Sequence, residues 1–329
     1  MRRVLRMLVD FIYALSYHIN LLRISDIAIE DYIARHLHGA PRYKEPKRLG
    51  AHELQMFSQS GADGIIAEIF RRISRTNSIF VEFGVGNGLE NNTTALLLQG
   101  WSGVWIEASK KKNKKIQKEL KPLIDERKLT VLAQFVTKDN IVAHLEGCSL
   151  PRDLDLVSID IDGNDYWVWE ALLSRYTPRV VVIEYNALLG PSAPWVMEYN
   201  PAHARARVIV TSYEGASLKA MEMLGKRKGY SLVACDFLGV NAFFVRDDLL
   251  EDKFCAPYTS ENHFEPQRLF LYRRNGPPRK VGRFVIPMNL ADRLAHTASA
   301  GPRAPACSHL PPSAYLAVEE DRELTRELV

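Results

Sequence analysis

Cysteine is scarce in this sequence, and the four cysteines form no CxxC pair and no cysteine–histidine spacing typical of zinc: Cys148, Cys235, Cys255 and Cys307. This scarcity argues against a disulfide-stabilised scaffold and predicts a reducing, cytoplasmic location. A strong excess of one charge is also lacking, because 43 basic residues face 39 acidic ones for a net charge of +4. No global field therefore draws the chain toward nucleic acid or anionic lipid. The hydrophobic content of 47% excludes a wholly disordered or fibrous chain.

Long hydrophobic runs are lacking too. The uncharged stretch from Phe11 to Leu22 is bounded by Asp10 and Arg23 and is too short to span a bilayer, so we expect a soluble chain. Apolar residues recur there at a 3-4-3-4-3 spacing that predicts one face of a helix: Leu5, Leu8, Ile12, Leu15, Ile19 and Leu22. We expect this face to pack on its own domain or on a partner subunit by self-association. Contact with a membrane surface is the alternative, because the flanking arginines suit anionic lipid.

The chain divides into three parts by pattern. Residues 1–50 form an N-terminal helical segment with a basic linker, 51–250 an α/β domain, and 251–329 a proline-rich, partly disordered C-terminal extension. Seven β-rich runs lie in the middle part, at 78–83, 103–108, 130–136, 154–161, 179–185, 230–237 and 239–246. A helical region is predicted from about Ala51 to Asn77, ahead of the first run. Helical segments alternate with the first five runs, which predicts a parallel sheet with helices on both faces. The connection 237–239 is too short for a crossover, so the last two strands must be antiparallel.

A glycine-rich loop follows the first predicted strand, in the sequence Glu82-Phe83-Gly84-Val85-Gly86-Asn87-Gly88. Glycine allows sharp turns and close approach of a ligand, and the following helix N-terminus offers free N–H groups. A dinucleotide-binding fingerprint needs a third small residue at position 89, which is Leu89, so nicotinamide or flavin binding by this loop is disfavoured. No GK[ST] sequence follows, which excludes a phosphate-binding P-loop. Glu107, which ends the second strand, is placed to accept both hydroxyls of a ribose.

These residues carry a resemblance to a known family. The Glu-x-Gly-x-Gly-x-Gly motif at 82–88, Glu107 and the closing hairpin resemble a class I S-adenosylmethionine-dependent methyltransferase. The stretches SIDIDGND at 158–165 and GVNAFFVRDDL at 239–249 are similar to its FkbM-like branch. The resemblance covers about residues 78–250 and implies a Rossmann-like seven-stranded, mostly parallel sheet with an antiparallel last strand, plus N-terminal helices.

The resemblance also implies that S-adenosylmethionine crosses the carboxyl ends of the first and fourth strands. It assigns eight residues to this cofactor: Glu82, Gly84, Gly86, Gly88, Glu107, Phe135, Val136 and Asp160. The glycines and Glu82 would face the methionine moiety, and Glu107 the ribose. Phe135 and Val136 would border the adenine. Asp160, together with Asp162, would sit beside the amino acid part of the cofactor and the transferring methyl group.

Several polar residues fall at the carboxyl ends of the fourth and fifth strands, where open α/β sheets bind ligands. A hydroxyl acceptor needs its proton removed, and Asp162 is our first candidate for the base, with Glu184 second. Alternatively, Asp160, Asp162 and Asn186 could present oxygen ligands to Mg²⁺, as in metal-dependent O-methyltransferases of this fold. A third interpretation is that residues 162–165 form a turn that caps the next helix. His203 and His263 lie outside the predicted sheet and are secondary candidates for a base.

The predicted function is methylation of a hydroxyl on a small metabolite or sugar-like acceptor, with Ala187–Thr211 as a substrate lid. One alternative is a non-catalytic scaffold that keeps the fold and binds a partner. Another is an RNA methyltransferase that uses the lysine-rich segment Lys110–Lys121. That segment lacks arginine and interleaved aromatic residues, so nucleic acid is disfavoured and an exposed helix face is expected.

Overall fold

A computed structural model describes residues 2–203 and 214–271 of the chain. Seven strands form one sheet in this part: β1 (Ile79–Phe83), β2 (Ser102–Ile106), β3 (Leu129–Leu132), β4 (Leu156–Ile159), β5 (Val180–Glu184), β6 (Tyr230–Cys235) and β7 (Asn241–Arg246). Their order across the sheet is β3-β2-β1-β4-β5-β7-β6. All seven predicted β-rich runs therefore contain a strand.

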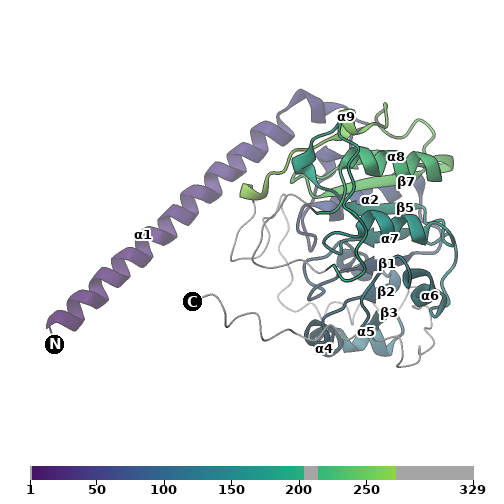
Figure 1. Cartoon of the computed structure of the whole chain (residues 1–329). Coiled ribbons are helices and arrows are strands. Elements are labelled where there is room, and N and C mark those ends of the chain that lie inside the picture. The colour runs from purple at the N-terminus through teal and green to yellow at the C-terminus, as the bar shows by residue number, and fades with distance from the viewer. Residues whose placement is uncertain (1, 204–213, 272–329) are drawn as a thin grey trace.

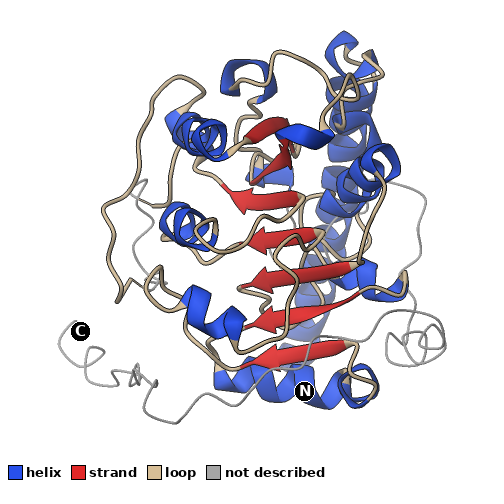
Figure 2. Cartoon of the chain, turned by 90° about the vertical axis from the view of Figure 1, so that its right-hand side faces the viewer, coloured by secondary structure: helices blue, strands red, loops and turns tan. Residues whose placement is uncertain are grey.

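The direction of the strands also matches the prediction. Strands β1 to β5 pair in parallel, whereas β7 runs antiparallel to both of its neighbours, β5 and β6. The sheet is stacked strand upon strand between two helical layers (Figure 2). The predicted fold class, a mostly parallel seven-stranded sheet with an antiparallel last strand, is confirmed.

Helices cover both faces of the sheet. One face packs against α2 (Ala62–Ile73), α3 (Thr94–Leu98), α4 (Lys110–Glu119) and α5 (Lys121–Asp125). The other packs against α6 (Ile141–Glu146), α7 (Asp165–Leu172) and α8 (Leu218–Lys228). Successive side chains of a strand alternate between the two cores: Val81 and Phe83 lie in one and Phe80 in the other. Burial on both faces explains why the strands are almost continuously apolar.

Short elements complete the described part. A π-helical turn spans Ala34–His38 and α9 spans Ser260–His263. Five 3-10 turns span Pro41–Lys44, Gly50–His52, Ala187–Leu189, Asp247–Leu249 and Leu269–Leu271.

The N-terminal helix α1 (Arg2–Ile33) extends away from the rest of the molecule (Figure 1). Its end docks on the domain within the described part of the chain: Ile33 forms a small core with Phe237, Leu271 and Leu37, which comes from the π-helical turn beyond the helix. The exposed large apolar side chains before this contact are Val9, Phe11, Ile12, Tyr13, Leu15, Tyr17, Leu21, Ile24 and Ile27. Among the described residues, no helix is long and apolar enough to cross a membrane.

Two segment predictions need comment. The region 51–77 was expected to be helical, but residues 53–61 form a loop and α2 starts at Ala62. This loop turns because the Asp63 carboxylate accepts hydrogen bonds from three successive backbone N–H groups, Met56 to Ser58, each 2.8 Å long. Residues 251–271 of the expected extension pack on the domain, with Phe254 and His263 buried. Residues 272–329, with their predicted tail, lie outside the described residues.

Candidate functional site

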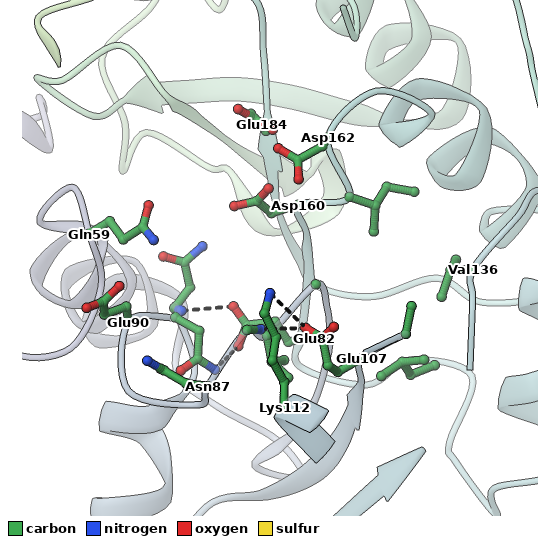
Figure 3. A pocket seen from close by; sticks show the side chains of 18 of the residues that line it. Gln59, Glu82, Asn87, Glu90, Glu107, Lys112, Val136, Asp160, Asp162 and Glu184 are labelled. Atoms are coloured by element: carbon green, nitrogen blue, oxygen red, sulfur yellow. Dashed lines mark hydrogen bonds and ion pairs between the residues drawn. The ribbon is translucent and has the colours of Figure 1, made fainter. Parts of the chain in front are cut away.

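A cavity of about 550 Å³ opens at the carboxyl edge of the parallel strands. Its walls come from the ends of β1, β2, β4, β5 and β7, the segment after β3 and the loop before α2. Seven of the eight residues assigned to the cofactor line it, all except Gly88, as do both base candidates, Asp162 and Glu184. Residues from five strand ends thus meet around one space (Figure 3).

The three glycines of the loop have different surroundings. A Cβ on Gly84 would lie 1.7 Å from the carbonyl oxygen of Asp160, so this glycine lets β1 and β4 approach closely at their ends. A Cβ on Gly88 would press on the Trp105 indole at 2.7 Å, so Gly88 packs inward. Only Gly86, at φ +60°, has nothing within 4 Å of such a Cβ. Gly86 is therefore the glycine that leaves open space beside the loop.

Glu82 is almost fully buried and anchors the segment that follows the glycine loop. Its carboxylate accepts hydrogen bonds from the backbone N–H groups of Asn92 at 2.8 Å and Thr93 at 3.1 Å, and from the Asn91 side chain at 2.7 Å. Burial raises the pKa of Glu82, and these hydrogen bonds oppose the rise. In this arrangement Glu82 shapes the loop that borders the cavity.

Glu107 lies at the end of β2 beside the glycine loop. One carboxylate oxygen accepts the Gly86 N–H at 2.8 Å and the other accepts the Ser109 N–H at 2.8 Å. The Lys112 ammonium lies 3.9 Å from the first of these oxygens (Figure 3). Each carboxylate oxygen has a second acceptor site, so Glu107 can take hydroxyl donors from a ligand while it holds the loop.

Phe135 and Val136 lie after β3 and border the cavity on the side away from Gln59 and Glu90, as the placement of Val136 in Figure 3 shows. The Asn140 side chain fixes this segment, because it donates to the Phe135 carbonyl at 2.9 Å and accepts the Thr137 N–H at 2.8 Å. An apolar wall held in this way suits a flat aromatic group.

Three carboxyl groups meet at the ends of β4 and β5. One oxygen each from Asp160, Asp162 and Glu184 lies within 4.8 Å of the others (Figure 3). Burial and the neighbouring carboxylates raise the pKa of Asp160 to about 7 and that of Glu184 well above its ordinary value. The charged forms of both groups are therefore disfavoured in the folded protein.

The turn after β4 is held by Asp165 at the start of α7. Its two oxygens accept the N–H groups of Ile161 and Gly163, each at 2.8 Å, and burial raises its pKa to about 6. Asp162 takes a left-handed backbone conformation at φ +58° in this turn. The interpretation of 162–165 as a helix-starting turn thus holds for Asp165, while Asp162 lines the cavity.

The two histidines that were secondary candidates for the base lie in different places. His203 lines the cavity, and its Nε2 lies 3.0 Å from the Asp162 carbonyl oxygen. His263 is buried elsewhere, with Nε2 3.0 Å from the Cys255 carbonyl oxygen, and burial lowers its pKa to about 3. His263 is therefore a structural residue. The predicted lid reaches His203 in the structure, and its residues 204–211 lie outside the described part.

The donor set for a divalent cation differs from the one we expected. The Asn186 side chain accepts the Leu188 N–H at 3.1 Å and donates to the Glu214 carbonyl at 3.0 Å, so it holds a turn outside the cavity wall. Glu184 takes its place beside Asp160 and Asp162. Three carboxylates are hard oxygen donors that suit Mg²⁺ or Ca²⁺.

Sequence reasoning missed several polar residues of the wall, among them Gln59, Glu90, Asn91 and Asn241. Gln59 comes from the loop before α2, and Asn241 faces Glu184 across the antiparallel pair β5–β7. The Asn241 side chain donates to the Ser60 hydroxyl at 3.0 Å, which ties the loop to the sheet. No local pattern marks these positions, because they meet only through the strand order.

No protein-family model and no curated protein matches the chain. Among solved structures, it is similar to magnesium protoporphyrin IX methyltransferase (ChlM) from Synechocystis PCC 6803, with a TM-score of 0.36, 12% identity, and coverage of 68% of this chain and 97% of that one. It is also similar to the glycopeptide N-methyltransferase MtfA, with a TM-score of 0.35, 13% identity, and coverage of 56% and 86%. A third similar structure is a SAM-dependent methyltransferase from Aquifex aeolicus, with a TM-score of 0.34, 9% identity, and coverage of 55% and 88%. Likenesses this distant support no conclusion about activity or ligand.

Proposed function

We propose that the protein is an S-adenosylmethionine-dependent methyltransferase that methylates a hydroxyl of a small metabolite or sugar-like acceptor. The observation that carries the proposal is the convergence of Gly86, Glu107, Val136 and Asp160 on one cavity at the carboxyl edge of the sheet. These residues come from four separate segments, and each has a side chain or a backbone suited to a different part of the cofactor. The resemblance of the motif Glu82–Gly88 to class I methyltransferases adds to this support.

The residues present fit the cofactor. Gly86 leaves room beside the loop, since nothing lies within 4 Å of the Cβ that another residue would place there. Glu107 would bind the ribose hydroxyls, and Phe135 and Val136 would pack against the adenine. Asp160 would lie by the amino acid part. The bound cofactor supplies an activated methyl group, so the chain needs to align the acceptor and exclude water.

The acceptor hydroxyl must lose its proton as it attacks, and the carboxyl cluster is suited to take it. Asp162 remains our first candidate for the base and Glu184 the second, because both line the cavity next to Asp160. Once Asp160 loses its proton, the cluster gains a carboxylate that can accept one. We therefore expect the methylation rate to rise with pH through about 7, the pKa of Asp160.

The first test is calorimetric titration of S-adenosylhomocysteine into wild-type protein and into Glu107→Ala. We expect micromolar binding that falls by at least about 30-fold in the variant, since two charge-assisted hydrogen bonds to the ribose are lost. Glu107 also holds the Gly86 N–H, so Lys112→Ala is the matched control: it removes a neighbour of Glu107 and leaves the loop hydrogen bond in place. Absence of binding to folded wild-type protein would reject the proposed function and favour the scaffold alternative.

Magnesium assistance is a separable part of the proposal. Asp160, Asp162 and Glu184 could together hold Mg²⁺ beside an acceptor oxygen and lower the pKa of its hydroxyl. If so, titration of MgCl₂ into the protein releases a proton near neutral pH, and Glu184→Gln abolishes the binding heat. If MgCl₂ gives no binding heat while S-adenosylhomocysteine still binds, magnesium takes no part and a carboxylate alone acts as the base.

A further inference from the structure

The described part of the cavity wall carries many more carboxyl groups than basic groups. Asp160, Asp162 and Glu184 point toward one another at the ends of β4 and β5 (Figure 3). Lys112 is the only lysine or arginine among the described residues that line the cavity, and its ammonium lies 3.9 Å from the Glu107 carboxylate, on the proposed ribose side. Asp160 and Glu184 therefore form no ion pair with a lysine or arginine of the described wall.

This excess of acidic groups favours a positively charged ligand. Ionised carboxyl groups with oxygens within 4.8 Å of one another repel, and a cation placed among them removes the repulsion. The sulfonium of the proposed methyl donor balances one negative charge, and this positive charge is lost when the methyl group is transferred. A second positive charge on the acceptor would balance a further carboxylate and would remain after the transfer.

Asn241 gives a second observation, which is independent of the carboxyl groups. Its side chain is 5% exposed, and its Nδ2 donates to the Ser60 hydroxyl at 3.0 Å, whereas its Oδ1 has no hydrogen-bond partner among the described residues. Asn241 lines the same cavity and pairs with Glu184 across β5–β7, so the two side chains lie on the same face of the sheet. An amide oxygen only accepts hydrogen bonds, and a buried one without a donor is unfavourable. This part of the wall therefore favours a hydrogen-bond donor.

An ammonium group has both properties, because it is positively charged and offers three donors and no acceptor. The proposed bases belong to the same carboxyl cluster, so the ammonium and the reacting hydroxyl must lie close together in the acceptor. We propose that the acceptor is an amino sugar or another vicinal amino alcohol, whose ammonium group binds beside Glu184 and Asn241. This acceptor class rests on the proposed function, because the methylated hydroxyl is the one next to the ammonium.

Binding of three sugars to protein saturated with S-adenosylhomocysteine tests the acceptor class. Glucosamine has an ammonium group in place of one hydroxyl of glucose, and glucuronate carries a carboxylate. S-adenosylhomocysteine has no sulfonium, so the charge of the methyl donor does not mask the effect. We expect saturation-transfer NMR titrations to show glucosamine binding at least about 10-fold more tightly than glucose, because a charge-assisted hydrogen bond replaces a neutral one. Glucuronate should bind more weakly than glucose.

Two variants connect the preference to the named residues. Glu184→Gln keeps the shape of the side chain and removes its charge, so the preference for glucosamine over glucose should fall to about 3-fold or less. Asn241→Leu removes the acceptor oxygen and should weaken glucosamine more than glucose. The matched control Glu119→Gln removes a carboxylate on α4 that pairs with Lys115 outside the cavity, and it should keep the full preference. Melting curves verify folding, and Glu184→Gln alone decides if Asn241→Leu does not fold.

Four results would overturn the acceptor class. These are equal affinity for glucosamine and glucose, tightest binding of glucuronate, and no binding of any of the three sugars to the folded, S-adenosylhomocysteine-loaded protein. The fourth is a preference that disappears in millimolar MgCl₂, which would assign the carboxyl groups to a metal. The proposed function fails separately: it is rejected if S-adenosylhomocysteine does not bind, whereas bound S-adenosylhomocysteine without a preference for glucosamine rejects only the amino acceptor.

Discussion

At the scale of single residues, the clustered carboxyl groups of Asp160, Asp162 and Glu184 lower the stability of the folded protein. Asp160 lies partly buried beside Asp162, Asp165 and Glu184, so its charged form is disfavoured. The unfolded chain has no such neighbours, and its aspartates ionise near pH 4. Above about pH 7 the folded protein therefore carries a negative charge on Asp160 that its buried, acidic surroundings disfavour. The cost shrinks as the pH falls from 7 toward 4, because the folded state then keeps the proton.

Asp160→Asn should consequently stabilise the protein at alkaline pH. We expect a gain of about 1–3 kcal/mol in the free energy of unfolding at pH 8, which diminishes at pH 5, where the wild-type carboxyl is already protonated. Urea unfolding at the two pH values measures the difference. Asp125→Asn, at an exposed carboxyl paired with Lys121, is the control and should show no comparable gain. A gain of equal size at pH 5 and pH 8 would contradict the assigned pKa.

Alanine substitutions at Gly84 and Gly86 distinguish an effect on folding from an effect on ligand binding. In Gly84→Ala the new Cβ would overlap the Asp160 carbonyl, so β1 and β4 must separate at their ends. We expect a loss of several kcal/mol, about 3 or more. In Gly86→Ala the Cβ meets no atom, and the positive φ alone costs about 1–2 kcal/mol. Gly86→Ala should therefore fold and still lose S-adenosylhomocysteine binding in calorimetry, because the methyl group occupies the space reserved for ligand. Unchanged affinity in the folded variant would remove Gly86 from the binding site.

Sequence patterns located part of the cavity wall and missed the rest, and particular residues show why. Gly86, Glu107 and Asp160 lie at strand ends, and a strand end is recognisable from the apolar run that precedes it. Gln59 and Asn241 have no such marker, since both reach the cavity through contacts between distant segments. The predicted cluster contained Asn186, whereas the structure places Glu184 beside Asp160 and Asp162. The cause is similar, because the turn after β5 directs the Asn186 amide to Leu188 and Glu214.

At the scale of elements, the loop between His52 and α2 is the least predictable wall of the cavity. Its sequence was expected to be helical, and it folds back because Asp63 takes the hydrogen bonds that a helix would have made. The Ser58 hydroxyl also donates to Asp63 at 2.8 Å. The loop then carries Gln59 to the cavity and Ser60 to Asn241. One buried carboxylate thus positions the whole loop.

Asp63→Ala should release this loop. Three N–H groups lose their acceptor, those of Phe57 and Ser58 in a buried setting, and we expect the free energy of unfolding to fall by about 2–4 kcal/mol. Hydrogen exchange at Met56, Phe57 and Ser58 should accelerate, while exchange in β1 and β4 keeps its wild-type order. Asp63→Asn retains one acceptor oxygen and should give an intermediate effect. Exchange that accelerates uniformly across the sheet would show that Asp63 supports the core as a whole.

At the scale of the whole molecule, the two edges of the sheet have opposite roles. The carboxyl edge gathers like charges around a cavity, while the amino edge holds a fully satisfied ion pair. There Asp155 accepts from the N–H groups of Thr76, Asn77 and Ser78 and pairs with Arg179 at 3.0 Å. Both of its members are buried, and Arg179 also donates to two carbonyls at the end of α2. Apolar patterning predicts the strands themselves, but this cluster joins α2, β1, β4 and β5 through contacts that only the folded chain reveals.

Asp155→Ala tests this division of roles. The variant leaves the Arg179 guanidinium buried without a counter-charge, so the free energy of unfolding should fall by about 3–5 kcal/mol. Removal of the exposed partner Asp248 from Arg246 should cost less than about 1 kcal/mol. Because Asp155 lies at the amino edge, S-adenosylhomocysteine affinity of the folded Asp155→Ala protein should equal that of wild type in calorimetry well below the melting temperature. Equal stability of the Asp155→Ala and Asp248→Ala variants would mean that the amino edge does not support the fold. A selective loss of affinity in Asp155→Ala would mean that the two edges are coupled through β4.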